Sequence, residues 1–210
     1  SDVCSSDLQG GGGRADAKAD GNVNAQMGGV ISSLAGDVNL SALNTNTTVN
    51  SRADGWAGGG VAVSIFDSTA SVGGETTATV KNGTDIHSRN FALKADAHDA
   101  ADAQMFTRGI GLGAGAGGAA DATVNTKTSA TFGEGQLTQL SAAGDVAMLA
   151  SSQESAHAHL DGSSFGGLAV GSVNSKVNVT TATSAVLADG AKVNQAGVIP
   201  IIFAVSILLF

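Results

Sequence analysis

Apolar and polar residues alternate with a period of two along three Val- and Thr-rich segments, residues 78–81, 124–128 and 176–179. Such alternation, carried by β-branched side chains, is typical of a β-strand with two different faces. Two Ala-rich segments, ADAHDAADAQ (95–104) and SSQESAHAHL (151–160), have a composition that helices also tolerate, but they show the same alternation. Frequent glycine further disfavours helices. The sequence therefore predicts strands in all of these segments.

The strands belong to a repeat. The motif AGDVNLSA (35–42) returns as SRNFALKA (88–95) and AGDVAMLA (143–150), and begins again at NQAG (194–197). The steps between the last alanines of the first three copies are 53 (95 − 42) and 55 (150 − 95), and the step to the fourth copy is 53 (197 − 144). A period of this length predicts an array of repeats. The expected units are 10–42, 43–95, 96–150 and 151–197.

This array predicts an all-β repeat solenoid, and we expect a right-handed parallel β-helix. Small Ala, Val and Gly residues at inward positions suit strands that stack on neighbouring coils about 4.8 Å apart. Each unit is expected to contain two or three coils. The motif AGDVNLSA is expected to be the closing strand of a unit, with Gly36-Asp37 setting the turn before it.

A second turn is expected in every complete unit, at Gly83, Gly133 and Gly190. Hairpins remain an alternative to coils, because Asn-Gly and Asp-Gly dipeptides between alternating strands are hairpin signals. Such dipeptides occur at Asn82-Gly83, Asp161-Gly162 and Asp189-Gly190.

Composition narrows the class of protein. Glycine accounts for 30 of 210 residues and aromatic residues for 4%, which suits thin stacked layers better than a bulky core. The hydrophobic content of 42% is too high for simple disorder. A net charge of −8 without a basic stripe disfavours nucleic-acid binding. Cys4 is the one cysteine, so neither a disulfide framework nor a thiol metal cluster is expected.

The Gly-rich AxAxxxG-type patches, the VxxxTxA strands and the AGDVxLxA motif together resemble the repeats of leukotoxin-type filamentous adhesins of Gram-negative bacteria. The resemblance covers about residues 10–197 and rests on the order of the segments within each repeat. It implies a very long exported protein whose repeats form a β-helical stalk, outside the cell or at the bacterial surface in association with the outer membrane. It also implies partners among the surface molecules of host or neighbouring cells. No motif allows a cell-binding or toxic residue to be carried over.

The two ends differ from the repeats. SDVCSSDL (1–8) equals the translation of a common sequencing-library adapter, so we expect it to be an artefact that precedes a repeat array over 9–197. The apolar tail 198–210 breaks the repeat, because Val198 stands where earlier copies have Asp after Gly. It is shorter than the roughly 20 apolar residues of a membrane helix. We expect a frameshifted or truncated end, with a buried final strand as an alternative.

Candidate sites are few. His157, His159 and Asp161 are expected on one face of a strand, and two imidazoles with a carboxylate are a conceivable metal set. The segment GIGLGA (109–114) fits a dinucleotide fingerprint in form, but it lies in a patch that is Gly-rich in every unit. Residues 10–22 lack the nonapeptide spacing of calcium β-rolls. We therefore expect no metal and no other cofactor, with His157, His159 and Asp161 as weak candidates.

Other functions have weaker support. Thr-x-Thr elements at 77–79, 126–128 and 181–183 suggest an ice-binding ladder, which Lys127 interrupts. A polysaccharide-degrading β-helix would need a positioned carboxylate pair. The glutamates do not recur in register; they are Glu75, Glu134 and Glu154. Five aromatic residues are expected to pack at caps or turns; they are Trp56, Phe66, Phe106, Phe132 and Phe165.

The sequence therefore predicts a non-catalytic, structural or adhesive segment of a secreted or cell-surface filamentous adhesin. An ice-binding or calcium-stabilised β-solenoid is the alternative, and a polysaccharide-degrading enzyme is a weaker one. We expect neither a nucleic acid nor a small-molecule substrate as a partner. Self-association through exposed strand edges is also expected.

Overall fold

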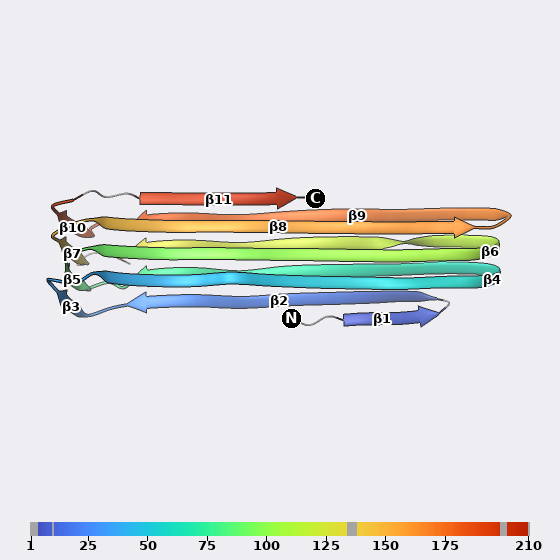
Figure 1. Cartoon of the computed structure of the whole chain (residues 1–210), viewed down its shortest axis with the longest axis horizontal. Coiled ribbons are helices and arrows are strands. Elements are labelled where there is room, and N and C mark those ends of the chain that lie inside the picture. Colours follow the sequence, from blue (N-terminus) through green and yellow to red (C-terminus); the bar gives the residue numbers. More distant parts are fainter. Residues whose placement is uncertain (1–3, 10, 134–137, 198–200, 210) are drawn as a thin grey trace.

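The computed structural model describes residues 4–9, 11–133, 138–197 and 201–209, and every regular element within them is a strand. The elements, shown in Figure 1, are β1 (Cys4–Gln9), β2 (Gly12–Met27), β3 (Val30–Ser33), β4 (Val38–Val80), β5 (Asp85–Ser88), β6 (Phe91–Phe132), β7 (Gln139–Ala142), β8 (Val146–Phe165), β9 (Leu168–Leu187), β10 (Lys192–Gln195) and β11 (Ile201–Leu209). All nine ladders between these strands are parallel. The predicted all-β solenoid is therefore confirmed, and hairpins are excluded for the described residues.

Each coil is a long, flat loop with an outward run, a bend and a return run. The bend lies near residues 59–60 in β4 and 111–112 in β6. Before the bend, Gly58 and Ile110 align with the end of β8. After it, Val61 and Gly113 align with the start of β9. The short strands β3, β5, β7 and β10 stack at the opposite end, on the left of Figure 1. Each coil therefore contains two long runs and one short strand.

The ladders reproduce the sequence period. Val38 pairs with Phe91 and Phe91 with Val146, which are steps of 53 (91 − 38) and 55 (146 − 91). One unit is therefore one coil, and the expectation of two or three coils per unit is wrong. The motif AGDVNLSA is also misassigned as a closing strand, because Val38–Ala42 open the long strand β4. The period fixes the length of a unit, but the number of turns inside it depends on where the chain folds back.

The turns are as expected. Gly83, Gly133 and Gly190 have φ angles of 74°, 79° and 81°, a left-handed conformation that favours glycine. At the other turn, before each long strand, side chains bridge successive coils. Asn90 Nδ2 donates to Asp37 Oδ1 at 2.9 Å, and the amide of Asp145 donates to Asn90 Oδ1 at 2.9 Å. The polar turn residues therefore hold neighbouring coils in register.

The interior consists of two apolar clusters with a polar layer between them. The cluster beside the short strands includes Ile86, Phe91, Leu93, Phe132 and Leu140. The cluster toward the bend includes Val49, Phe66, Val72, Met105 and Val124. Phe66 is therefore a core residue within a strand, and the expectation that it packs at a cap or turn is wrong. Phe132 is a core residue at the end of β6, beside the turn at Gly133.

The end segments continue the stack. In β1, Cys4–Gln9 pair with residues 51–56 of β4, and in β11, Ile201–Leu209 pair with residues 148–156 of β8. The step from Met148 to Ile201 is 53 (201 − 148), the same as in the repeats. The artefact and frameshift interpretations of the two ends stay predictions. Residues 1–3, 10, 198–200 and 210 of these segments lie outside the described residues.

Candidate functional site

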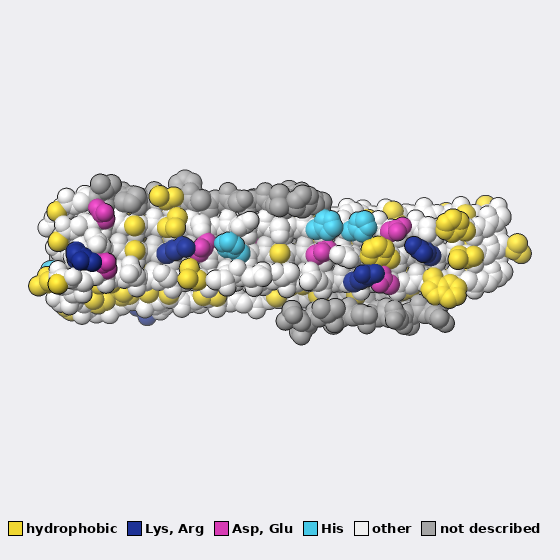
Figure 2. Space-filling view, viewed as in Figure 1, with side chains coloured by type: hydrophobic (Ala, Val, Ile, Leu, Met, Phe, Trp, Pro, Cys, Tyr) yellow, Lys and Arg dark blue, Asp and Glu magenta, His cyan; other side chains and the backbone are white. Residues whose placement is uncertain are grey.

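The outer face of the outward runs carries a group of aromatic, histidine and charged side chains, which neighbouring coils place side by side. We call this group the outer cluster; it consists of Arg52, Asp54 and Trp56 of β4, Asp102, Gln104, Phe106 and Arg108 of β6, and His157, His159 and Asp161 of β8. Figure 2 shows acidic, basic, histidine and large hydrophobic side chains gathered on this face, over the half of the molecule nearer the bend. The parallel register aligns Arg52 with Gln104 and Gln104 with His159.

Ring and charge contacts connect the outer cluster across three coils. The Arg52 guanidinium lies 4.7 Å from the centroid of the Phe106 ring, within cation–π range. Its Nε also lies 2.6 Å from Asp54 Oδ2. On the other side, the Phe106 and His159 rings are 5.5 Å apart. The strands thus hold these side chains in a fixed arrangement that solvent and a partner can reach.

His157, His159 and Asp161 occupy alternate outward positions of β8, as the period of two predicts. The two imidazoles stack with centroids 6.2 Å apart and planes 9° apart, and His157 Nδ1 lies 3.2 Å from Asp102 Oδ1. Within the part of the chain that the structure describes, no group of three or more His, Cys, Asp or Glu side chains is placed to hold a metal ion. The metal-ligand role of these residues stays a prediction.

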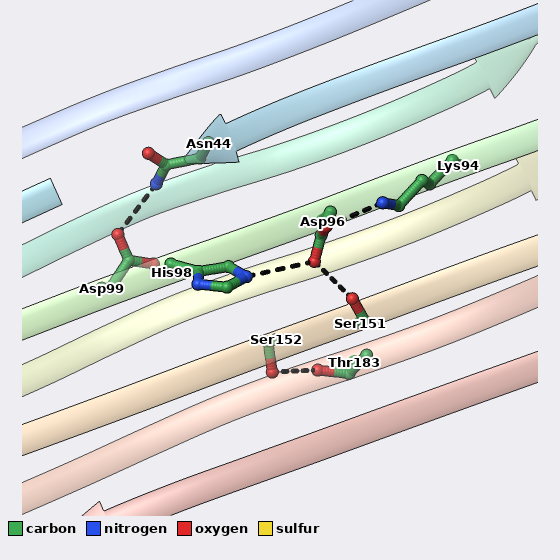
Figure 3. A network of polar contacts seen from close by, with 8 residues as sticks. All are labelled: Asn44, Lys94, Asp96, His98, Asp99, Ser151, Ser152 and Thr183. Atoms are coloured by element: carbon green, nitrogen blue, oxygen red, sulfur yellow. Dashed lines mark hydrogen bonds and ion pairs between the residues drawn. The ribbon is translucent and has the colours of Figure 1, made fainter. Parts of the chain in front are cut away.

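A second candidate site lies inside the coils, where two carboxylates meet. Glu154 on β8 pairs in register with Asp99 on β6, and their side chains are 0% and 5% exposed. Asp99 Oδ1 accepts a hydrogen bond of 2.8 Å from Asn44 Nδ2 (Figure 3). Glu154 Oε1 accepts one of 2.9 Å from Thr126 Oγ1, while Glu154 Oε2 is buried without a hydrogen-bond partner among the described residues. This is an incompletely satisfied polar layer between two apolar clusters.

Burial favours the neutral forms of these two carboxyl groups. Loss of water, together with the nearby Asp99 carboxylate, raises the pKa of Glu154 to about 7 against the hydrogen bonds from Thr126 and Thr181. Loss of water also raises the pKa of Asp99, against the hydrogen bond from Asn44. Glu154 can therefore hold a proton near neutral pH.

The threonines that suggested an ice-binding ladder mostly face the interior. Thr126 pairs with Thr181 and Thr128 with Thr183, and Thr126 and Thr128 are buried. Ser152 and Thr183 share a hydrogen bond of 2.8 Å inside the coil (Figure 3). The hydroxyl groups of Thr126 and Thr181 bond the Glu154 carboxylate. Thr77 and Thr79 align with Ser129 and Thr131, so the three elements do not stack as one ladder. The ice-binding alternative stays a prediction.

A pocket of about 500 Å³ opens on the outer face of the return runs; its lining includes Asn22, Gly74, Glu75, Thr126 and Lys127. Glu75 and Lys127 form a weak ion pair of 4.0 Å there. Thr126, which lines this pocket, donates its hydroxyl hydrogen to the buried Glu154. Glu154 and Asp99 are neighbours, but their burial keeps a sugar chain from reaching them. Glu134, the remaining glutamate, lies outside the described residues.

The segment GIGLGA (109–114) lies at the bend, within β6. A dinucleotide site needs a helix after the glycines, whereas this strand continues to Phe132. The glycines serve the bend instead. A Cβ on Gly111 would lie 2.3 Å from the backbone oxygen of Gly59 in the neighbouring coil, too close for any side chain.

Sequence reasoning missed the pairing of Asp99 with Glu154. A signal was present, because the two residues are 55 positions apart (154 − 99), the same as the second repeat step. This spacing makes the two residues neighbours only if each unit is one coil. With two or three coils per unit, these side chains would not have been direct neighbours.

The fold defines the class of protein as a parallel β-solenoid whose repeat unit is a single broad coil. Among the described residues there is no helix suited to crossing a membrane. No family model, curated protein or solved structure matches the chain.

Proposed function

We propose that the chain is a structural and adhesive segment of a large filamentous adhesin, secreted or held at the cell surface, with no catalytic role of its own. The observation that supports the proposal is the in-register stacking of coils at steps of 53 and 55 residues. In such a stack each coil contacts only its neighbours, so that the array can grow by adding coils.

The dimensions of the coil set the shape of such a filament. An outward run from Val38 to the bend near Gly59 is about 22 residues, or roughly 70 Å at 3.3 Å per residue, while each coil adds about 4.8 Å of height. About fifteen coils are needed before the stack is taller than it is wide. The filament is therefore a broad ribbon, and a long one requires the very long chain that the adhesin resemblance implies.

The outer cluster supplies the adhesive surface in this proposal. Its rings and ions lie on the rigid strand scaffold, which lowers the entropy lost when a partner binds. Its carboxylates, guanidinium groups and imidazoles offer both hydrogen-bond donors and acceptors. Surface molecules of a host or neighbouring cell are the partners that this mixture fits.

The stacking part of the proposal is tested by adding a coil. A second copy of residues 91–145, inserted before Val146, supplies one complete 55-residue coil. We expect the circular dichroism spectrum to keep its strand signature and small-angle scattering to show a height increase of about 4.8 Å. An inserted coil that is unfolded, or that behaves as a separate flexible body, contradicts the solenoid growth.

The adhesive part is tested with protein-coated beads on cultured epithelial cells. We expect the double variant Phe106→Ala/His159→Ala to lose most of the bead binding, because it removes the centre of the outer cluster. The control is His98→Ala, which changes an exposed histidine on the same face nearer the short strands. Equal binding of all three proteins, or none by the parent chain, rejects the adhesive role and leaves the stacking intact.

A further inference from the structure

The bends form a charge-free edge along one side of the solenoid. Residues 55–66, 109–120 and 162–175 contain no Asp, Glu, Lys or Arg. The ladders align these three segments, for example Gly58 with Ile110 and Ile110 with Phe165. We call them the bend segments.

The bend segments expose large apolar side chains on both faces and at the edge itself. Val61, Leu112 and Leu168 are 83%, 80% and 71% exposed. The other exposed apolar residues divide between the faces, with Trp56, Ile110 and Phe165 on the outward runs and Val63, Ile65 and Val170 on the return runs. A soluble protein rarely exposes so continuous an apolar region without a partner for it.

On the return face of this edge, a glycine separates two exposed valines. Gly115 of the middle coil lies between Val63 on one side and Val170 on the other. A Cβ on Gly115 would lie 3.6 Å from Val63 Cγ2, so the neighbouring side chain flanks the glycine. Gly115 therefore places no side chain between the two exposed valines.

Between β4 and β6 the backbone stays paired through the bend, which suits an apolar medium. Lipid offers no hydrogen bonds, so each N–H and C=O group placed there needs a partner within the protein. The ladder between β4 and β6 continues through the bend, with pairs at Gly59–Gly111 and Val61–Gly113 on either side of the Gly60–Leu112 position. Neighbouring coils thus satisfy almost all of the backbone between β4 and β6 at this edge.

We propose that the bend segments are an edge that inserts into the interface of a lipid bilayer. A flat protein partner would cover one face and leave the other exposed, whereas a bilayer surrounds both faces and the tip. At the border of the edge, Trp56 pairs in register with Arg108, and a tryptophan beside a cation is typical of a membrane–water boundary. The inference goes beyond the adhesin proposal and does not depend on it.

The test uses flotation of the full chain with phosphatidylcholine vesicles. Trp56 is the only tryptophan, so its fluorescence reports directly on the border of the edge. Its side chain is half exposed in the free protein. We expect the chain to float with the vesicles, the emission of Trp56 to shift to shorter wavelength, and lipids brominated on the acyl chain to quench it.

Matched leucine variants separate insertion from a general loss of stability. Leu112→Asp places a charge at the edge, whereas Leu34→Asp changes a leucine of similar exposure, 75%, at a turn beside the short strands. We expect Leu112→Asp to weaken vesicle binding at least about tenfold and Leu34→Asp to change it less than about twofold. Circular dichroism checks that both variants keep the strand signature.

Several results would overturn the proposal. They are no flotation of the parent chain, equal binding of the parent and Leu112→Asp, or equal weakening by both variants. Binding to phosphatidylglycerol vesicles alone would assign the contact to headgroup charge and not to insertion. Loss of a dimer in Leu112→Asp, measured by sedimentation without lipid, would assign the edge to a second copy of the chain. Each of these outcomes leaves the bead assay of the outer cluster unaffected.

Discussion

Replacement of the buried Glu154 by glutamine is the sharpest test of the interior. The native state holds the proton of Glu154 more tightly than the unfolded chain does, because burial raises the pKa from its ordinary 4.5 to about 7. The contribution of Glu154 to stability is therefore fully present below pH 4.5, and it is lost as the pH rises through about 7. Glutamine remains neutral throughout this range, so the variant does not share this loss.

The size of the effect follows from the displacement of the pKa. At 1.36 kcal/mol per pH unit, the distance from 4.5 to about 7 corresponds to about 3 kcal/mol of stability lost between pH 4 and pH 8. From pH 4 to pH 8, the parent chain should lose this amount of unfolding free energy relative to Glu154→Gln. We compare this difference at several pH values and not at one. A cost of the glutamine amide group that does not depend on pH is the same at every pH, so it cancels from the change.

The assay is guanidinium unfolding at half-unit steps from pH 4 to pH 8. Circular dichroism reports the strands and Trp56 fluorescence reports the bend, and agreement of the two transitions supports two-state analysis. Asp161→Asn is the control, since it removes a carboxylate of the outer cluster. Asp99→Asn is a second probe, because loss of the neighbouring charge lowers the pKa of Glu154 and moves the pH midpoint down.

A parent chain whose stability is flat from pH 5 to pH 8 would contradict a raised pKa of Glu154. The same conclusion would follow if Glu154→Gln kept the full pH dependence, or if Asp161→Asn removed as much of it. In those cases Glu154 is solvated in the native state, and the polar layer is open to water.

Two further predictions concern the packing of the coils. Gly118 has a φ of 147° and a Cβ there would lie 1.7 Å from the Phe66 carbonyl oxygen, so we expect Gly118→Ala to destabilise the chain by more than about 2 kcal/mol. Gly60→Ala, which has open space around its Cβ, should change stability by less than about 0.5 kcal/mol in the same unfolding assay. Phe132→Ala leaves a cavity beside Phe91, whose ring is 5.6 Å away, and should cost about 3–5 kcal/mol. The exposed Phe165→Ala should cost little in thermal unfolding, and equal losses for both phenylalanines would contradict the placement of the core.

Local patterns determined the elements of this protein. Alternation with a period of two identified the strands, including the Ala-rich segments 95–104 and 151–160. Glycine at 83, 133 and 190 marked the left-handed turns, because other residues rarely adopt that conformation. The spacing of AGDVNLSA and its copies gave the length of the repeat. All of these are properties of short segments or of simple distances along the chain.

Tertiary structure decided which side of each strand is the interior and how many turns a unit contains. A period of two separates two faces but does not say which one is buried. In β4 the irregular pairing between Asn44 and Thr47 exchanges the inward and outward positions within one run, and the bend exchanges them again. Thr126 and Thr128 therefore face inward, and Phe66 is a core residue.

The sequence by itself thus determined that this chain is a stack of β coils with a repeat of 53 to 55 residues. Only the tertiary structure brought Asp99 next to Glu154, placed the outer cluster on one face and gathered the apolar bends along one edge. The physical reason is that these groups join residues more than fifty positions apart. Such contacts exist only once each coil lies in register on its neighbours.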